Sequence, residues 1–215
     1  MPTTAEGEAA FMERDYQRAR EIWEPLAERG DAEAEAWLGA LYANGLGAER
    51  DVSRAFALYL RAAEQGNALA ANNVGAMYAK GEGVGADPVK AASWFQRAAE
   101  AGDALGQFNY AVLLTKGQGV AVDMAQAVEW YRRASDGGHY PSQARLGYCH
   151  AKGLGTPVDR IEAFAWLSAA AQHGVGLAMA ELEELVRSMN DEEKREGRRR
   201  FAERAGRARA GMTMA

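Results

Sequence analysis

The sequence predicts an all-α fold in which about six helix-turn-helix hairpins stack into a solenoid, because one hairpin cannot bury its apolar stripe alone. Three observations predict this class. Alanine and 24 glycines dominate the apolar residues of the 215-residue chain, and small side chains favour helices that pack closely. A pattern of 36 residues recurs four times without an insertion, as in repeat proteins. Within each repeat, apolar residues recur at helical spacing.

The repeat also divides the chain into segments. Residues 1–30 are predicted to form an N-terminal capping hairpin, because Asp15 to Gly30 matches the second half of the repeat without the glycine loop before it. Residues 175–215 are predicted to form a C-terminal capping hairpin and a basic tail. The four repeats between them span residues 31–66, 67–102, 103–138 and 139–174. Repeat positions are counted from the first residue of each block.

The first helix of each repeat is predicted over about positions 2 to 14. Its apolar residues fall at positions 8, 11 and 12, as in Val74, Met77 and Tyr78. A glycine follows at position 15, where the residue after a helix often adopts positive φ. These glycines are Gly45, Gly81, Gly117 and Gly153.

The second helix is predicted to begin at an Asp in position 21, an N-cap residue type. These residues are Asp51, Asp87, Asp123 and Asp159. Alanines at positions 25 and 32 lie two turns apart and form a small-residue stripe, and a glycine at position 36 ends the helix. After the last repeat, Leu177 to Val186 matches the first helix, and a charged helix is predicted near Asp191 to Arg207.

The combined pattern resembles the Sel-one-like repeat (SLR) family, a branch of the tetratricopeptide-like superfamily. It consists of Leu-Gly-x-x-Tyr, Gly-x-Gly-Val, Asp, Ala, Trp-Tyr/Phe and Ala-Ala-Glu-x-Gly, and it is clearest from Val74 to Gly102. It covers about Asp15 to Val186. The resemblance implies a right-handed superhelix and a non-enzymatic adaptor that binds other proteins or peptides, often in bacterial signalling or envelope processes.

The tetratricopeptide pattern places positions 3, 6, 7, 10 and 14 of the first helix on the concave face, where we expect an extended partner segment to bind. An Asn at position 7 can pair with a peptide backbone, or it can brace neighbouring helices. A Lys at position 14 can meet an acidic segment, or it can stabilise the end of its own helix. The candidate residues are Trp37, Asn72, Asn73, Lys80, Phe108, Asn109, Lys116, Arg145, Tyr148 and Lys152.

Other motifs favour structural roles. Cys149 and His150 occupy positions 11 and 12, where the other repeats carry core residues, so a core pair is favoured over an activated thiolate. The glycines from Gly81 to Gly85 follow a helix rather than a strand, which favours a turn over a phosphate-binding loop. The three histidines lack metal-ligand spacing, so no metal or cofactor is expected.

A hydrolase of the β-lactamase-like or penicillin-binding type, described among cysteine-rich relatives, is the alternative function. This chain has one cysteine and no serine with a matched Lys or His in a defined motif, so no enzymatic activity is expected.

The charge distribution bears on partners and location. The chain has a net charge of −5, but residues 187–215 hold nine basic and five acidic residues. The acidic body argues against nucleic-acid binding, and acid-then-base pairs such as Glu196 and Arg200 favour a capping helix in the tail.

Neither a membrane span nor a signal peptide is evident. We therefore expect a cytoplasmic protein, or a periplasmic one if a signal peptide was removed; the oligomeric state is not predicted.

Overall fold

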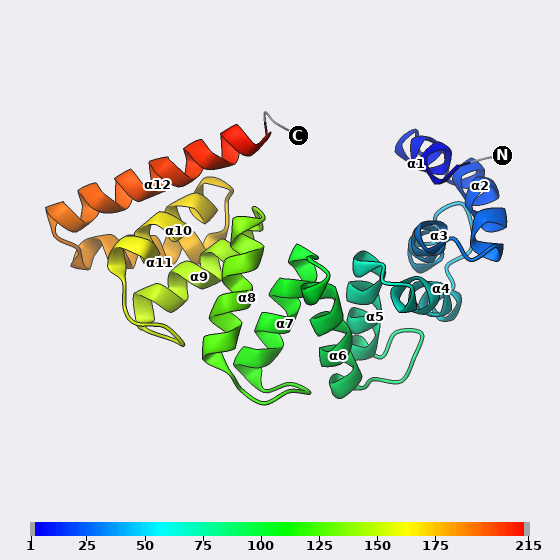
Figure 1. The fold of residues 1–215 in the computed structure, drawn as a ribbon, viewed down its shortest axis with the longest axis horizontal. Coiled ribbons are helices and arrows are strands. Elements are labelled where there is room, and N and C mark those ends of the chain that lie inside the picture. The colour runs from blue at the N-terminus through cyan, green and yellow to red at the C-terminus, as the bar shows by residue number, and fades with distance from the viewer. Residues whose placement is uncertain (1–2, 213–215) are drawn as a thin grey trace. The chain divides into compact units, whose positions relative to one another are not determined.

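A computed structural model describes residues 3–212 of the chain, and their side chains as far as residue 206. Within this range the chain forms twelve helices and no strand (Figure 1). The predicted all-α fold of about six helical hairpins is therefore confirmed. In chain order the helices are α1 (Thr4–Met12), α2 (Tyr16–Glu28), α3 (Ala32–Asn44), α4 (Val52–Glu64), α5 (Ala68–Lys80), α6 (Pro88–Glu100), α7 (Ala104–Lys116), α8 (Met124–Asp136), α9 (Tyr140–Lys152), α10 (Arg160–Gln172), α11 (Gly176–Ser188) and α12 (Asp191–Met212).

The helices belong to two compact units. The first unit comprises the residues up to Gly106 together with Gln118–Val120. The second comprises Gln107–Gly117 and the residues from Ala121 onward. Helices α1 to α6 and the first turn of α7 therefore lie in the first unit, and the rest of α7 with α8 to α12 lies in the second.

Glycine at position 15 ends the first helix of each repeat, as predicted. Gly81 has a φ of 72°, and its N–H donates to the carbonyl oxygen of Met77 at 2.8 Å. A residue with a side chain would be strained in this left-handed conformation. The equivalent glycines have φ of 66° at Gly45, 66° at Gly117 and 70° at Gly153.

Aspartate caps the second helix of each repeat, also as predicted. The side chain of Asp51 accepts a hydrogen bond from the backbone N–H of Arg54 at 2.9 Å. Such a cap contributes about 1 kcal/mol to helix stability. The same capping bond to the first turn is made by Asp15, Asp87, Asp123 and Asp159.

Small residues allow the two helices of a hairpin to approach closely. A Cβ built on Gly75, which lies on α5 at position 9 of the repeat, would be 2.8 Å from the ring of Phe95 on α6. The predicted alanine stripe on the second helices is almost completely buried, with no member more than 1% exposed. Its members are Ala55, Ala62, Ala91, Ala98, Ala127, Ala134, Ala163 and Ala170.

Glycine at position 17 lies against the main chain of the preceding hairpin. Gly47 has a φ of 65°, and a Cβ built there would lie 2.6 Å from the carbonyl carbon and oxygen of Tyr16, the first residue of α2. The same close approach occurs at the first residues of α4, α6 and α8. The equivalent pairs are Gly83 with Val52, Gly119 with Pro88 and Gly155 with Met124.

Aromatic side chains pack together at the N-terminal end of the first unit and cover it. Trp23 is fully buried, and its indole N–H donates to the carbonyl oxygen of Thr4 at 3.1 Å. The rings of Trp23 and Trp37 stack with centroids 5.2 Å apart and planes 7° from parallel. Phe11 of α1 lies 5.2 Å from the ring of Trp37, so α1 covers the first repeat.

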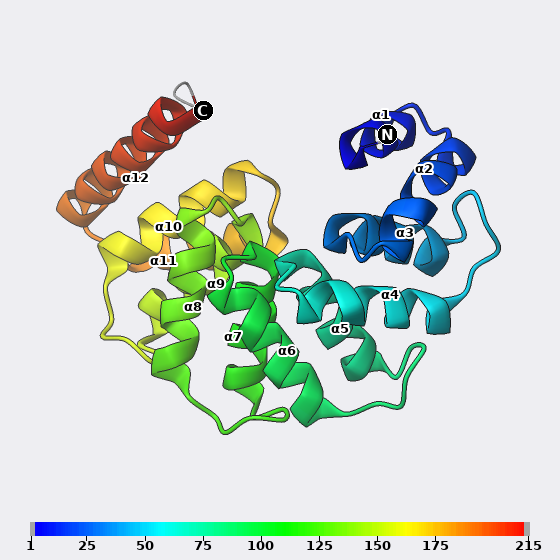
Figure 2. The same ribbon diagram turned by 45° about the vertical axis from the view of Figure 1, so that its right-hand side comes forward.

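Helix α12 covers the C-terminal end of the second unit by packing on α10 (Figures 1 and 2). A Cβ on Gly197 would lie 2.7 Å from the ring of Phe164. The carboxylate of Glu162 on α10 accepts hydrogen bonds from Arg200 and Arg204, each at 2.5 Å. The predicted charged helix is therefore present, and it runs to Met212 instead of Arg207. Residues 213–215 of the basic tail, and tail side chains beyond residue 206, lie outside the described residues.

Candidate functional site

The predicted partner-binding residues lie on the first helices of the repeats in both units. In each unit, we call the surface formed by positions 3, 6, 7, 10 and 14 of its first helices the inner face of that unit. In the first unit it includes Trp37 on α3 and Asn72, Asn73 and Lys80 on α5. In the second unit it includes Phe108, Asn109 and Lys116 on α7 and Arg145, Tyr148 and Lys152 on α9.

In the second unit, inner-face residues of neighbouring helices contact each other. The Nζ atom of Lys152 on α9 lies 3.0 Å from Oε1 of Glu184 and 3.3 Å from Oε2 of Glu181, both on α11. The hydrogen bond to Glu184 raises the pKa of Lys152. Continuing the repeat frame into α11 gives Glu181 position 7 and Glu184 position 10. These two glutamates lie after the four predicted repeats and are not among the predicted residues, although one further step of the same frame reaches them.

The other inner-face residues of the second unit differ in exposure. Lys116 and Arg145 are exposed, and Tyr148 is half-buried. Phe108 packs beside His139, with ring centroids 5.1 Å apart. Asn109 is half-buried and already interacts with another group of the chain. The exposed predicted residues of this unit are thus the three cations Lys116, Arg145 and Lys152.

In the first unit, packing already occupies two of the four predicted residues. Trp37 belongs to the aromatic cluster with Trp23, and Asn72 is only 6% exposed and has an interaction partner. Asn73 is half-buried, and no hydrogen bond to its side chain is formed by the described residues. Lys80 is exposed. Asn73 and Lys80 lie seven residues apart, two helical turns, and therefore on one face of α5.

Cys149 and His150 belong to the core, as predicted. They are 3% and 5% exposed. Burial raises the pKa of the Cys149 thiol to about 11, so the thiol stays protonated at neutral pH. Burial, together with the nearby Arg132, lowers the pKa of His150. The pair therefore lacks the thiolate and imidazolium that nucleophilic catalysis requires.

Two further predictions concern cofactors and membranes. The loop from Gly81 to Gly85 joins α5 to α6 and follows a helix, which is the geometry of an interhelical turn. Among the described side chains, no group of three or more His, Cys, Asp or Glu residues is placed to hold a metal ion. Over the described part of the chain, none of the helices combines the length and apolar character needed to cross a membrane.

The fold and the repeated caps define a class: a helical-repeat protein with small residues between its hairpins. The sequence model of the Sel1 repeat family matches residues 5–31, 32–67, 68–103, 104–139 and 141–175. The chain belongs to the Sel1 repeat family, which confirms the resemblance found in the sequence. Sel1 repeats typically serve as protein-interaction scaffolds.

Two solved structures show the same fold. The crystal structure of a Sel1 repeat protein from Oxalobacter formigenes is 30% identical, with a TM-score of 0.78 over 85% of this chain and 75% of that chain. The structure of c5321, described as a protective antigen of uropathogenic Escherichia coli strains with an SLR fold, is 28% identical, with a TM-score of 0.80. That match covers 88% of this chain and 41% of c5321. Both solved structures support the predicted all-α solenoid fold. No functionally curated protein matches the sequence.

Proposed function

We propose that this protein is a non-enzymatic scaffold that binds an extended segment of a partner protein along its inner face. The observation that carries the proposal is the contact of Lys152 on α9 with Glu181 and Glu184 on α11. Lys152 holds position 14, and the two glutamates hold positions 7 and 10. These positions of two neighbouring helices therefore lie on one surface. Neighbouring helices lie about 8–10 Å apart. An extended chain rises about 3.3 Å per residue, so about every third residue of the segment meets the next helix.

Asn73 supports backbone recognition. Its amide can donate to a peptide carbonyl and accept from a peptide N–H, whatever the partner's side chains. The amide is half-buried, which limits its motion, and no hydrogen bond within the described residues competes for it. Asn109 occupies the same repeat position on α7, but a peptide there would compete with its existing interaction.

Exposed cations support an acidic partner segment. Lys80 in the first unit, and Lys116 and Arg145 in the second, are all exposed at inner-face positions. Lys152 is already paired with two carboxylates, so it contributes least to attracting an acid. Exposed charges mainly accelerate encounter. We therefore expect binding to weaken as salt rises from low to physiological concentration.

The proposal is tested by co-purification from the native organism with quantitative mass spectrometry. The inner-face variants are Asn73→Ala and Lys116→Glu, and the matched control is Lys90→Glu, an exposed lysine on the second helix α6. We expect the wild type and the control to recover the same partners and both inner-face variants to lose them. Equal recovery by all four proteins would contradict the proposal.

Once a partner is identified, the Lys116→Glu variant shows whether Lys116 attracts the partner or only stabilises the end of α7. If Lys116 steers an acidic segment, the substitution slows association and leaves the melting temperature nearly unchanged. If Lys116 only stabilises the end of α7, the melting temperature falls and association is unaffected.

The alternative of a hydrolase gains no support from Cys149 and His150, since both are core residues. Hydrolysis of nitrocefin by the purified chain would contradict the scaffold proposal.

A further inference from the structure

In the four repeats, the second helix of the hairpin covers a defined stripe of the first helix. Position 9 is Gly39, Gly75, Ala111 or Gly147. A Cβ on the three glycines would lie 2.9 Å from the ring of Tyr59, 2.8 Å from that of Phe95 and 2.7 Å from the Leu167 side chain, all at position 29. Positions 5, 8 and 12 of the first helix are at most 9% exposed. These residues are Glu35, Leu38, Tyr42, Ala71, Val74, Tyr78, Gln107, Tyr110, Leu114, Gln143, Leu146 and His150.

Helix α11 occupies the place of a first helix, but its stripe is not covered in this way. Its position 9 is Glu183, a long charged residue where most other repeats have glycine. The Glu183 side chain is 68% exposed and forms an ion pair with Arg187 one turn later. The helix that follows, α12, packs instead on α10, through Gly197 and the two arginines bound to Glu162.

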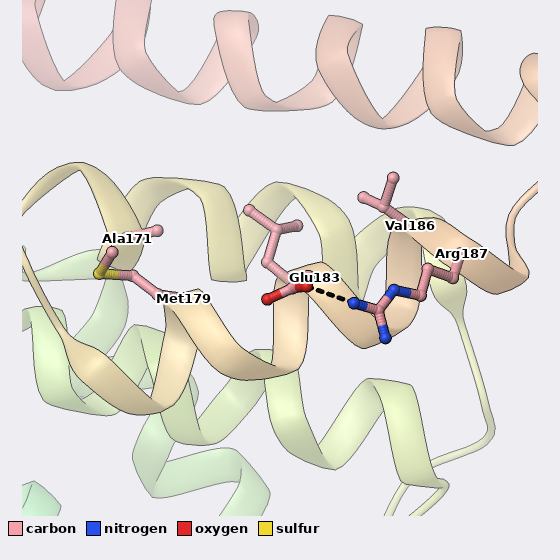
Figure 3. A pocket seen from close by; sticks show the side chains of 6 residues that line it. Ala171, Met179, Glu183, Val186 and Arg187 are labelled. Carbon is pink, nitrogen blue, oxygen red and sulfur yellow. Dashed lines mark hydrogen bonds and ion pairs between the residues drawn. The ribbon is translucent and has the colours of Figure 1, made fainter.

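Among the described side chains, an apolar cleft of about 490 Å³ lies along this stripe of α11, where Leu182 and Val186 are half-buried. Met179, Leu182 and Val186 line it from positions 5, 8 and 12, and Ala171 lines it from α10. In Figure 3, Val186 points toward the side on which α12 runs, and a dashed line marks the ion pair between Glu183 and Arg187 on α11. Met179 is 56% exposed. We call this surface the α11 cleft.

We propose that the α11 cleft binds an amphipathic α-helix of a partner protein, in the place that a second helix occupies in the other repeats. The four repeats indicate that the ligand is a helix, because a second helix covers positions 5, 8 and 12 of the first helix in each of them. This surface is separate from the inner face, and the proposal goes beyond the proposed function.

Charge at the edge of the cleft specifies the ligand further. Glu183 and Arg187 are 68% and 74% exposed, and an exposed ion pair of this kind contributes little to stability. Each residue can therefore exchange its partner for a group on an incoming helix at little cost. The ligand helix is expected to carry leucine or aromatic residues on one face, a Lys or Arg opposite Glu183, and a carboxylate opposite Arg187.

A peptide of this chain provides the probe. Residues 51–66 form α4 with its own cap, and in the fold they cover the equivalent stripe of α3. The peptide carries an apolar face with Leu58 and Tyr59, both basic and acidic residues, and the Arg61 that donates to Glu35 at 2.6 Å in the hairpin. We would label this peptide with fluorescein and titrate it with the purified full chain, following fluorescence anisotropy.

We expect saturable binding to the wild type. Met179→Asp should weaken it by about tenfold or more, because a carboxylate would then be buried under the ligand helix. Glu183→Lys should weaken it severalfold by opposing the basic residues of the peptide. Val89→Asp is the matched control, since Val89 is 64% exposed on a helix of the first unit, and it should bind like the wild type. Both cleft residues are exposed, so circular dichroism should show unchanged folding.

Three outcomes would overturn the proposal. One is the absence of saturable binding up to about 1 mM chain, the weak end of specific recognition. Another is equal binding by the wild type and Met179→Asp. The third is a dimer in sedimentation equilibrium that Met179→Asp dissociates, since this would assign the cleft to a second copy of the chain.

Discussion

Replacing Gly47 by Ala tests whether main-chain contact between hairpins stabilises the fold. A Cβ at this position would lie 2.6 Å from the carbonyl carbon and oxygen of Tyr16 and 2.8 Å from the backbone nitrogen of Gln17. All of these atoms belong to the main chain at the start of α2. Rotation of a side chain therefore cannot relieve the overlap, and one hairpin must move by about 0.8 Å to restore ordinary contact distances.

The cost has three parts. An alanine in the left-handed region costs about 1–2 kcal/mol, and overpacking costs about 1–3 kcal/mol. The lower entropy of alanine in the unfolded chain offsets about 0.4–1 kcal/mol. We expect Gly47→Ala to lower the free energy of unfolding by about 2–4 kcal/mol, which corresponds to a fall in Tm of roughly 5–15 °C for a chain of this size.

Gly66→Ala is the matched control. Gly66 has a φ of 92°, but a Cβ there would have no atom within 4 Å. Gly66→Ala therefore places an alanine at positive φ without any contact between hairpins. We expect it to lower the free energy of unfolding by about 1 kcal/mol and Tm by about 2–4 °C. Thermal melting by circular dichroism gives both values, and hydrogen exchange should show faster opening of α2 only in Gly47→Ala. Equal falls in Tm for the two variants would refute the reasoning.

Other predictions concern the core and the C-terminal helix. Ala91→Leu overfills the alanine stripe and should cost about 1–3 kcal/mol, whereas Cys149→Ala removes one buried atom and should change the melting temperature less; similar melting temperatures would contradict the repeat frame. Glu162→Gln weakens both arginine contacts of α12 and should cost about 2 kcal/mol and accelerate tryptic cleavage within α12, whereas Glu183→Gln at an exposed pair should do neither. Because burial lowers the pKa of His150 from 6.5, the unfolded chain binds a proton that the folded chain does not, and stability should fall as the pH drops below about 6.5. His150→Leu should flatten the dependence of Tm on pH between about 7.5 and 5.5, and an unchanged slope would show that another group titrates.

The helix-ending glycines and the N-cap aspartates could be predicted from the sequence, because each satisfies a requirement of the local backbone at a fixed position of the repeat. Gly81 ends α5 since the residue after the helix has positive φ, and Asp87 begins α6 since the first turn has free N–H groups. Neither requirement depends on distant parts of the chain. The spacing of these residues therefore predicts where the helices begin and end.

Contacts that occur once in the chain could not be predicted from the repeat. Trp37 holds an inner-face position, but it stacks in the N-terminal cluster beside Phe11, which belongs to α1, outside the four repeats. Lys152 meets Glu184 across 32 residues. The packing of α12 on α10 depends on Glu162 and Arg204, which lie 42 residues apart. The repeat frame identifies a face, but it does not show which residues on that face already have partners.

The glycine contacts at position 17 also have a consequence for how such a protein diversifies. Consecutive hairpins meet there through main-chain atoms and glycine, and exposed inner-face residues such as Lys80, Lys116 and Arg145 take no part in those contacts. If the inner face binds partners as proposed, substitutions at these exposed sites change recognition without altering the spacing of the hairpins. New ligand specificities could then evolve, or be grafted from one Sel1 protein to another, on an unchanged framework.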